Sequence, residues 1–138
     1  MLFFSSRDDQ NTKRLAAVVC KVIPENQIES FYKLEDFRDR LRKPIEPDSI
    51  AVLTASNQDE LQQMQTLRDL LTEIYVVLII PDQKKSTIGL AHLLLPRFLS
   101  QKENSFMDLE KVIEKMYKKS HPFEKENGIS GIGRQAGL

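Results

Sequence analysis

One uninterrupted apolar stretch sets the architecture of this chain: Ile74-Tyr75-Val76-Val77-Leu78-Ile79-Ile80, followed at once by Pro81-Asp82. It is too short for a transmembrane helix, which needs about 20 apolar residues. Its length suits a β-strand, and a strand without polar positions is typical of a parallel sheet that is covered on both faces. The stretch therefore predicts a strand inside a parallel sheet with helices on each side.

Further strand-like runs alternate with helix-like stretches over residues 1–119. The expected strands are Leu2–Ser5, Gln27–Tyr32, Ile50–Thr54, Tyr75–Ile80 and Arg97–Ser100. Apolar residues at helical spacing mark the segments between and after them: Leu15, Val18, Val19 and Val22; Leu34, Phe37 and Leu41; Met64, Leu67 and Leu71; residues 87–94; and Leu109, Val112, Ile113 and Met116. Each parallel crossover needs a helix, so the alternation predicts an α/β domain.

Polar residues and glycines mark where these elements begin and end. Residues 8–12 supply caps for the first helix, and Ser56-Asn57-Gln58-Asp59 and Ser105-Phe106-Met107-Asp108 fit capping boxes for two later helices. After residue 119 the apolar spacing stops, and Gly128, Gly131 and Gly133 follow. We therefore expect one domain over residues 1–119 and a flexible tail over residues 120–138.

Composition narrows the classes of function. The chain has 20 basic and 20 acidic side chains, so no overall charge attracts it to nucleic acid or to an anionic membrane. Its single cysteine, Cys20, cannot form an internal disulfide, which fits a reducing compartment, and the first residues lack the basic start of a signal peptide. These features predict a cytoplasmic protein that binds neither nucleic acid nor membranes.

The order and spacing of the five β/α units resemble the receiver domain of response regulators, over residues 2–119. The resemblance implies a flavodoxin-like, doubly wound, five-stranded parallel sheet of strand order 2-1-3-4-5, in three layers. It also implies a phosphate-accepting aspartate at the end of the third strand. Output in such domains runs through the face made by the fourth helix, the fifth strand and the fifth helix.

The residues at the receiver positions depart from the family pattern. The acidic pair that holds magnesium after the first strand has its candidates in Asp8 and Asp9, which lie later than the pattern places them. Thr54 falls at the phosphate-accepting position, where a hydroxyl cannot form an acyl phosphate. Lys102 stands near the position of the lysine that follows the fifth strand, but is shifted. The resemblance therefore implies a degenerate pseudo-receiver, which cannot be phosphorylated.

Simpler structural roles also account for several residues. Asp8 and Asp9 suit the start of a helix, where the helix dipole favours acidic groups, and Asp82 suits a turn at the exit of a strand. Cys20 is expected to be buried as a small apolar residue, and His92 has no spacing typical of a metal site or a catalytic triad. We expect no metal, no cofactor and no catalytic group.

The sequence favours a non-catalytic signalling protein that contacts another signalling protein or a second copy of itself, as a homodimer. Apolar residues are in excess between positions 90 and 99, so the expected contact surface comprises Ile88, Leu95, Phe98 and Tyr117. The alternative is a flavodoxin-like small-ligand-binding protein or enzyme, with a cleft at the carboxyl ends of the strands. That cleft would be lined by Ser5, Ser6, Thr54, Ser56 and Asp82.

Overall fold

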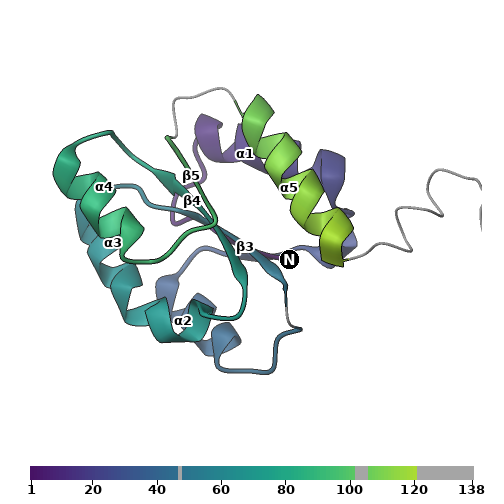
Figure 1. Cartoon of the computed structure of the whole chain (residues 1–138), viewed down its shortest axis with the longest axis horizontal. Helices are drawn as coiled ribbons and strands as arrows, with labels where there is room; N and C mark the ends of the chain where they lie inside the picture. Colours follow the sequence, from purple (N-terminus) through teal and green to yellow (C-terminus); the bar gives the residue numbers. More distant parts are fainter. Residues whose placement is uncertain (47, 102–105, 121–138) are drawn as a thin grey trace, which may run out of the picture.

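The computed structural model describes residues 1–46, 48–101 and 106–120. Its strands are β1 Leu2–Phe4, β2 Glu29–Phe31, β3 Ile50–Thr54, β4 Tyr75–Ile80 and β5 Phe98–Gln101. They form one sheet in the order β2-β1-β3-β4-β5, in which every neighbouring pair is parallel (Figure 1). This confirms the expected flavodoxin-like, doubly wound α/β fold and its strand order.

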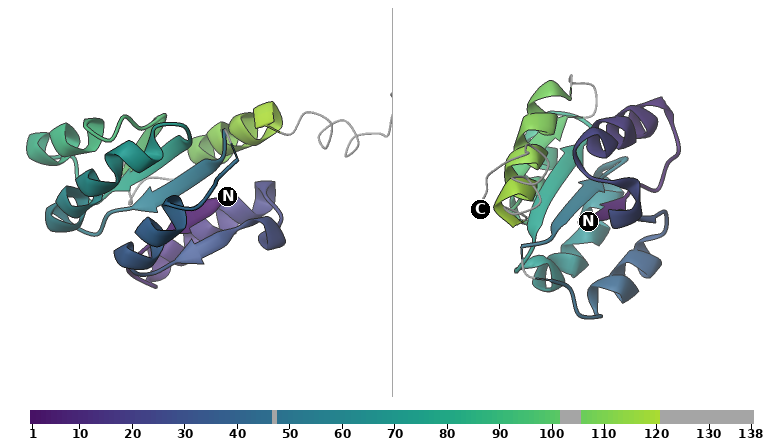
Figure 2. Two further views of the ribbon diagram at one scale, coloured as in Figure 1. Left: turned by 90° about the horizontal axis from the view of Figure 1, so that it is seen from below. Right: turned by 90° about the vertical axis from the view of Figure 1, so that its right-hand side faces the viewer.

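Helices cover both faces of the sheet and complete the three layers. The helices are α1 Gln10–Val22, α2 Leu34–Leu41, α3 Gln58–Met64, α4 Lys85–His92 and α5 Met107–Ser120, with two 3₁₀ segments, η1 Glu25–Gln27 and η2 Gln65–Leu71. Figures 1 and 2 show α1 and α5 on one face of the sheet and α2, α3 and α4 on the other. The edge strand β5 therefore lies between α4 and α5.

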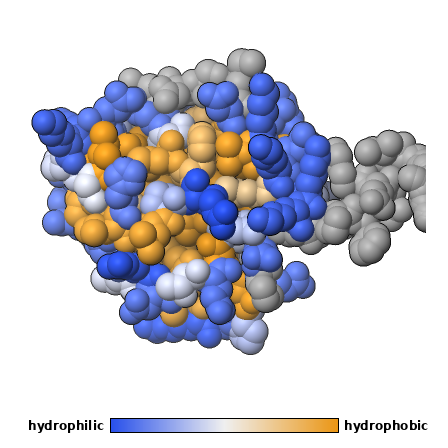
Figure 3. Space-filling model, in the orientation of Figure 1, coloured by the Kyte–Doolittle hydropathy of each residue, from blue (hydrophilic) through white to orange (hydrophobic). Residues whose placement is uncertain are grey.

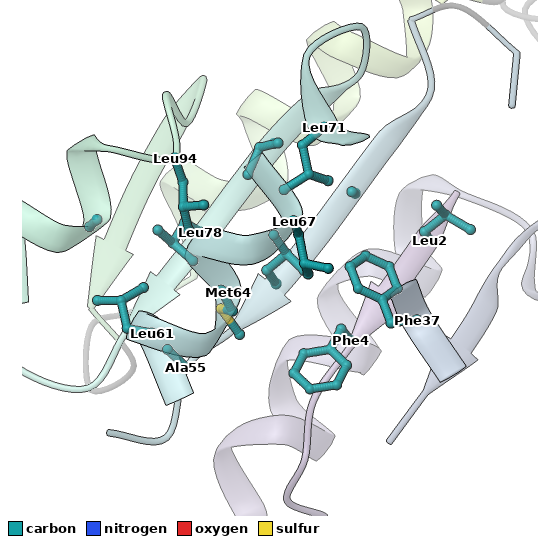
Figure 4. Packing of buried hydrophobic residues seen from close by; sticks show 14 of the residues in the cluster. Leu2, Phe4, Phe37, Ala55, Leu61, Met64, Leu67, Leu71, Leu78 and Leu94 are labelled. Carbon is teal, nitrogen blue, oxygen red and sulfur yellow. The ribbon is translucent and has the colours of Figure 1, made fainter. Parts of the chain in front are cut away.

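The apolar stretch forms β4, which is buried along its whole length as expected. The side chains that face α2, α3 and α4 are Val76, Leu78 and Ile80; those that face α1 and α5 are Tyr75, Val77 and Ile79. The sheet thus separates two hydrophobic cores, and Figure 4 shows the larger one, where Phe37, Met64 and Leu67 from the helical layer lie over the strands. Each fully buried Leu or Phe side chain contributes about 2 kcal/mol to this packing.

The helix α3 begins one residue later than the capping box predicts. Asn57, and not Ser56, is the N-cap, because its side-chain oxygen accepts a hydrogen bond from the Glu60 N–H at 2.8 Å. Glu60 in turn accepts a hydrogen bond from the Ser56 N–H at 2.9 Å. Asparagine caps a helix as well as serine does. The acidic residue of the capping box is therefore Glu60, whose longer side chain accepts the backbone N–H bond, and not Asp59 as expected.

The helix α4 covers Lys85–His92 instead of the expected residues 87–94. Its start is fixed by Asp82, whose carboxylate accepts a hydrogen bond from the Lys84 N–H at 2.9 Å. Its end is fixed by Leu95, which has a left-handed backbone with φ of 53° and is followed by a proline that cannot extend the helix.

Other bounds differ by a few residues. The strand β1 ends at Phe4 and not Ser5, and β5 starts at Phe98 and not Arg97. The strand β2 is shorter than expected, because η1 takes up the residues before it. The segment predicted as one helix around Met64 continues as the 3₁₀ segment η2. Three parts of the expectation lie outside the described residues: Ser105, which begins the second capping box; Lys102; and residues 121–138 of the expected tail.

The two ends of the described domain meet at Gln27. The ammonium group of Met1 donates a hydrogen bond to the Gln27 backbone oxygen at 2.8 Å, and the Tyr117 hydroxyl donates one to the Gln27 Oε1 at 2.8 Å. Tyr117 lies in the last turn of α5, so the first strand begins on the side of the molecule where the last helix ends (Figure 2).

Cys20 is exposed, which corrects the expectation that it is buried. Its neighbour Val19 points into the core from α1, and one residue along a helix turns the side chain by about 100°. Cys20 therefore lies off the buried face of α1, and its thiol is exposed. Among the described residues, no helix combines the length and the apolar composition needed to cross a membrane.

Candidate functional site

The sheet reverses its winding between β1 and β3, and their carboxyl ends are where open α/β sheets place their ligands. A cavity of about 30 Å³ lies at this point. Its lining comes from the ends of β1 and β3, the start of α1 and one aromatic before α5: Ser5, Arg7, Asp9, Asn11, Thr12, Leu15, Thr54, Ala55, Ser56, Ile79 and Phe106. The structure therefore brings together Ser5, Thr54 and Ser56 of the cleft expected from the sequence.

Ser5 joins the end of β1 to the start of α1 through hydrogen bonds. Its side chain is buried, with 2% exposure, and its hydroxyl donates to the Arg7 backbone oxygen at 2.8 Å. The Ser5 and Thr12 hydroxyl oxygens lie 3.0 Å apart, within hydrogen-bond distance. Ser6 points to the β3 side instead, where its hydroxyl meets that of Ser56 at 3.2 Å. These two serines stand directly after β1, so hydroxyl groups occupy the place that the receiver resemblance assigns to acids.

Thr54 closes the floor of the cavity at the end of β3. Its hydroxyl donates a hydrogen bond to the Phe4 backbone oxygen at 3.2 Å, across to the end of β1. A nucleophilic hydroxyl is activated by a group that takes its proton, such as imidazole or carboxylate, and a backbone carbonyl does not do this. The observed bond therefore gives the Thr54 hydroxyl a role in joining the two strands.

Asp8 and Asp9 lie at the start of α1 and not directly after β1. Asp9 is the N-cap of this helix: its carboxylate accepts a hydrogen bond from the Thr12 N–H at 2.9 Å. Asp8 is exposed. The helix dipole favours an acidic group at this end, which is the structural role considered for this pair. Within the described residues, no group of three or more His, Cys, Asp or Glu side chains is placed to hold a metal ion.

The cavity has the size of bound water and not of a cofactor. Its volume of about 30 Å³ accommodates one or two water molecules. Sites for drug-sized ligands and cofactors usually measure about 300–1,000 Å³. A nucleotide or flavin would fit only if the hydrogen-bonded segments after β1 and β3 moved apart.

Asp82 does not line this cavity. It lies after β4, and hydrogen bonds from the Thr87 hydroxyl and then from the Lys84 N–H hold the pKa of its carboxyl group below the ordinary value. Thr87 is fully buried and accepts a hydrogen bond from Gln58 Nε2 at 2.9 Å. Gln65 Nε2 donates to the Leu90 backbone oxygen at 2.9 Å. Asp82 is thus linked through Thr87 and Gln58 to α3, and the separate Gln65 bond ties η2 to α4.

The four residues of the expected contact surface do not form one cluster. Ile88 packs against the core on the α2–α4 side, whereas Phe98 and Tyr117 pack against the core on the α1–α5 side. Leu95 is 69% exposed. The sequence missed a second exposed leucine in the same loop, Leu93, at 49% exposure. The apolar excess between residues 90 and 99 was the available signal for it.

Figure 3 shows this side of the molecule in the orientation of Figure 1, with β5 between α4 and α5. Apolar residues gather across its middle, and hydrophilic ones surround them. The large exposed apolar residues of the described chain are Leu93, Leu95 and Tyr32. Tyr32 follows β2 at the opposite edge of the sheet, so the two leucines are the exposed apolar feature of the β5 side.

The chain was also compared with known proteins. No model of a protein family matches it, and no curated protein matches it in sequence.

Proposed function

We propose that the protein is a phosphorylation-incompetent, receiver-like signalling module, which works without catalysis in the cytoplasm through contacts with another protein or a second copy of itself. The observation that carries the proposal is the Thr54 hydrogen bond to the Phe4 carbonyl. It puts a strand-joining hydroxyl at the position that accepts phosphate in receivers. The serines after β1 and the water-sized cavity support the same conclusion.

The contact surface of the proposed module is the β5 side of the sheet. Exposed Leu93 and Leu95 lie there, and Figure 3 shows the apolar area around the edge strand. Exposed apolar areas rimmed by polar residues are typical of protein-binding surfaces. The exposed apolar surface supports a role in binding. The hydroxyl groups at the ends of β1 and β3, in place of the acids of receivers, support a domain that does not transfer phosphoryl groups.

The proposal is tested by incubating the protein with acetyl phosphate and magnesium and measuring its intact mass. We expect no gain. Hydroxylamine removes an acyl phosphate but not a phosphate ester of serine or threonine, so it identifies the linkage. A stoichiometric phosphate that hydroxylamine removes would contradict the proposal.

A small-ligand-binding protein of flavodoxin-like form is the second candidate, favoured by the position of the cavity where such sheets bind ligands. Melting temperatures measured with nucleotides, flavin and divalent cations separate the two candidates, because a ligand that binds only the folded state raises the melting temperature. No rise supports the signalling module, and a saturable rise with one of these compounds supports the second candidate.

A further inference from the structure

A second and larger groove lies between the amino end of β4 and the carboxyl-terminal half of α5. Its volume is about 390 Å³, within the range of ligand and side-chain binding sites. It is lined by Tyr75, Arg97, Val112, Lys115, Met116 and Lys119. We call it the α5 groove. Its floor is apolar and aromatic, and its walls carry cationic groups.

The lining of the α5 groove carries three cationic side chains and no acidic one. Arg97, Lys115 and Lys119 are exposed, and among the described residues no salt bridge includes any of the three. Two of the three acids of the same helix have other partners, since Glu110 pairs with Lys21 at 3.8 Å and Glu114 pairs with Lys118 at 3.2 Å. A ligand that brings a carboxylate would therefore meet cations that make no ion pair within the described chain.

Arg97 is held in an orientation that suits carboxylate binding. Its guanidinium group lies 4.4 Å from the centre of the Tyr75 ring. Contact with the face of an aromatic ring restricts the guanidinium and leaves its N–H groups at the edge, where two parallel hydrogen bonds to one carboxylate form. Because the Arg97 side chain is already restricted, the entropic cost of binding a carboxylate is smaller.

The loop that carries Arg97 also presents apolar side chains. Leu93 and Leu95 are 49% and 69% exposed. Leu95 has a φ of 53°, the left-handed conformation that ends α4 and that glycine or asparagine usually adopts at a helix end. The loop thus places two exposed leucines close in sequence to the fixed arginine.

We propose that the α5 groove and the Leu93–Arg97 loop bind a segment of a partner protein in which a carboxylate stands beside a bulky apolar side chain. The carboxylate pairs with Arg97 and the two lysines, and the apolar side chain enters the groove over Val112 and Met116. A second copy bound through the same groove would place these cations against their own copies. Charge complementarity therefore favours an acidic, apolar partner segment.

This inference rests on the proposed function, because it gives the chemistry of the partner that a signalling module would bind. A random peptide library displayed on phage and selected against the full chain tests it. We expect the enriched peptides to combine Asp or Glu with Leu, Phe or Trp. Peptides without acidic residues would overturn the proposal, and so would no enrichment at all. Peptides that match residues 121–138 would assign the groove to this chain itself and would also overturn it.

One enriched peptide is then labelled with fluorescein, and its affinity is measured by fluorescence polarisation. Arg97→Gln and Lys115→Gln should each weaken binding about tenfold, as expected for the loss of a charge-assisted hydrogen bond. Lys111→Gln is the matched control, because Lys111 is exposed on the same helix but does not line the groove. Equal affinities for all variants would show that the peptide binds elsewhere.

Circular dichroism confirms that each variant is folded, and light scattering follows its assembly state. A wild-type dimer that Arg97→Gln converts to a monomer would assign the groove to a second copy and overturn the partner proposal. The acetyl phosphate and ligand experiments are independent of peptide binding. A failed peptide selection with no phosphorylation and no ligand binding therefore rejects the α5 groove alone, whereas phosphorylation or ligand binding rejects the proposed function.

Discussion

The hydroxyl of Thr54 at the end of β3 donates a hydrogen bond to the backbone oxygen of Phe4 at the end of β1, at 3.2 Å. The two residues are neighbours only because the sheet pairs β1 with β3, in a register that aligns Phe4 with Leu53. The bond thus ties the two strands together at the point where the winding reverses.

Thr54→Val should lower the free energy of unfolding by about 1 kcal/mol, the usual net contribution of one hydrogen bond. Urea denaturation measures the change. Thr72→Val is the control, because the exposed Thr72 hydroxyl donates only to its own turn, to the Asp69 oxygen at 3.3 Å. The control should remain within about 0.5 kcal/mol of the wild type. Equal stabilities for the two variants would contradict a strand-joining role for Thr54.

Asp82→Asn should make stability less dependent on pH. The Thr87 hydroxyl and the Lys84 N–H lower the pKa of Asp82 in the folded state, so its ionised form stabilises the protein above the pKa of the unfolded chain. That stabilisation is lost as pH falls through the folded pKa. The melting temperatures of wild type and Asp82→Asn should therefore differ at neutral pH and converge below about pH 4. In a Thr87→Val background the difference at neutral pH should be smaller, and an unchanged difference would show that Thr87 has no part in it.

Leu78→Ala should destabilise the protein more than Phe98→Ala. Leu78 is fully buried in β4, and its truncation should cost about 3 kcal/mol, whereas Phe98 is only half-buried on the edge strand. Urea denaturation gives the order, and light scattering shows whether a wild-type dimer, if present, becomes a monomer in Phe98→Ala. If Phe98→Ala unfolds as readily as Leu78→Ala, Phe98 belongs to the core and not to a contact surface.

Leu95→Gly should raise stability while Leu93→Gly lowers it. Glycine relieves the left-handed strain at Leu95, a gain of about 0.5–1 kcal/mol after its own entropy cost. Leu93 has a right-handed helical backbone with φ of −66°, where glycine costs about 0.5–1 kcal/mol. Thermal unfolding of both variants measures the difference. Shifts in the same direction would argue that the backbone at Leu95 is not the source of strain.

The alternation of strands and helices and both core faces follow from patterns that local sequence carries, whereas the strand order was implied by the resemblance to receivers. The apolar stretch at β4 has no polar position, and a strand of that kind requires cover on both sides. Helical spacing around Leu15 and Leu109 marked the two helices that share one face. These signals are predictive because burial of apolar side chains is the dominant favourable term in folding.

The site depends on contacts between distant segments, which sequence spacing does not reveal. The Ser5–Thr12 and Ser6–Ser56 contacts form only after strand register and helix position are fixed. Ile88 packs against the core on one face of the sheet and Phe98 against the core on the other, at the two sides of the edge strand. A shift of one residue in a strand reverses the face of every side chain, and the sequence does not specify that parity for a short edge strand.

Met1 and Tyr117 both hydrogen-bond to Gln27, so the two ends of the described domain lie close together in space. Because the first strand begins close to where the last helix ends, a short linker could join the two, and new termini could be opened in the exposed loop at Gln83 and Lys84. Circular permutation would then leave both cores and the order of strands in space intact. For the same reason, the domain could be inserted into a loop of a host protein. The host chain would lead into the domain and out of it at neighbouring positions.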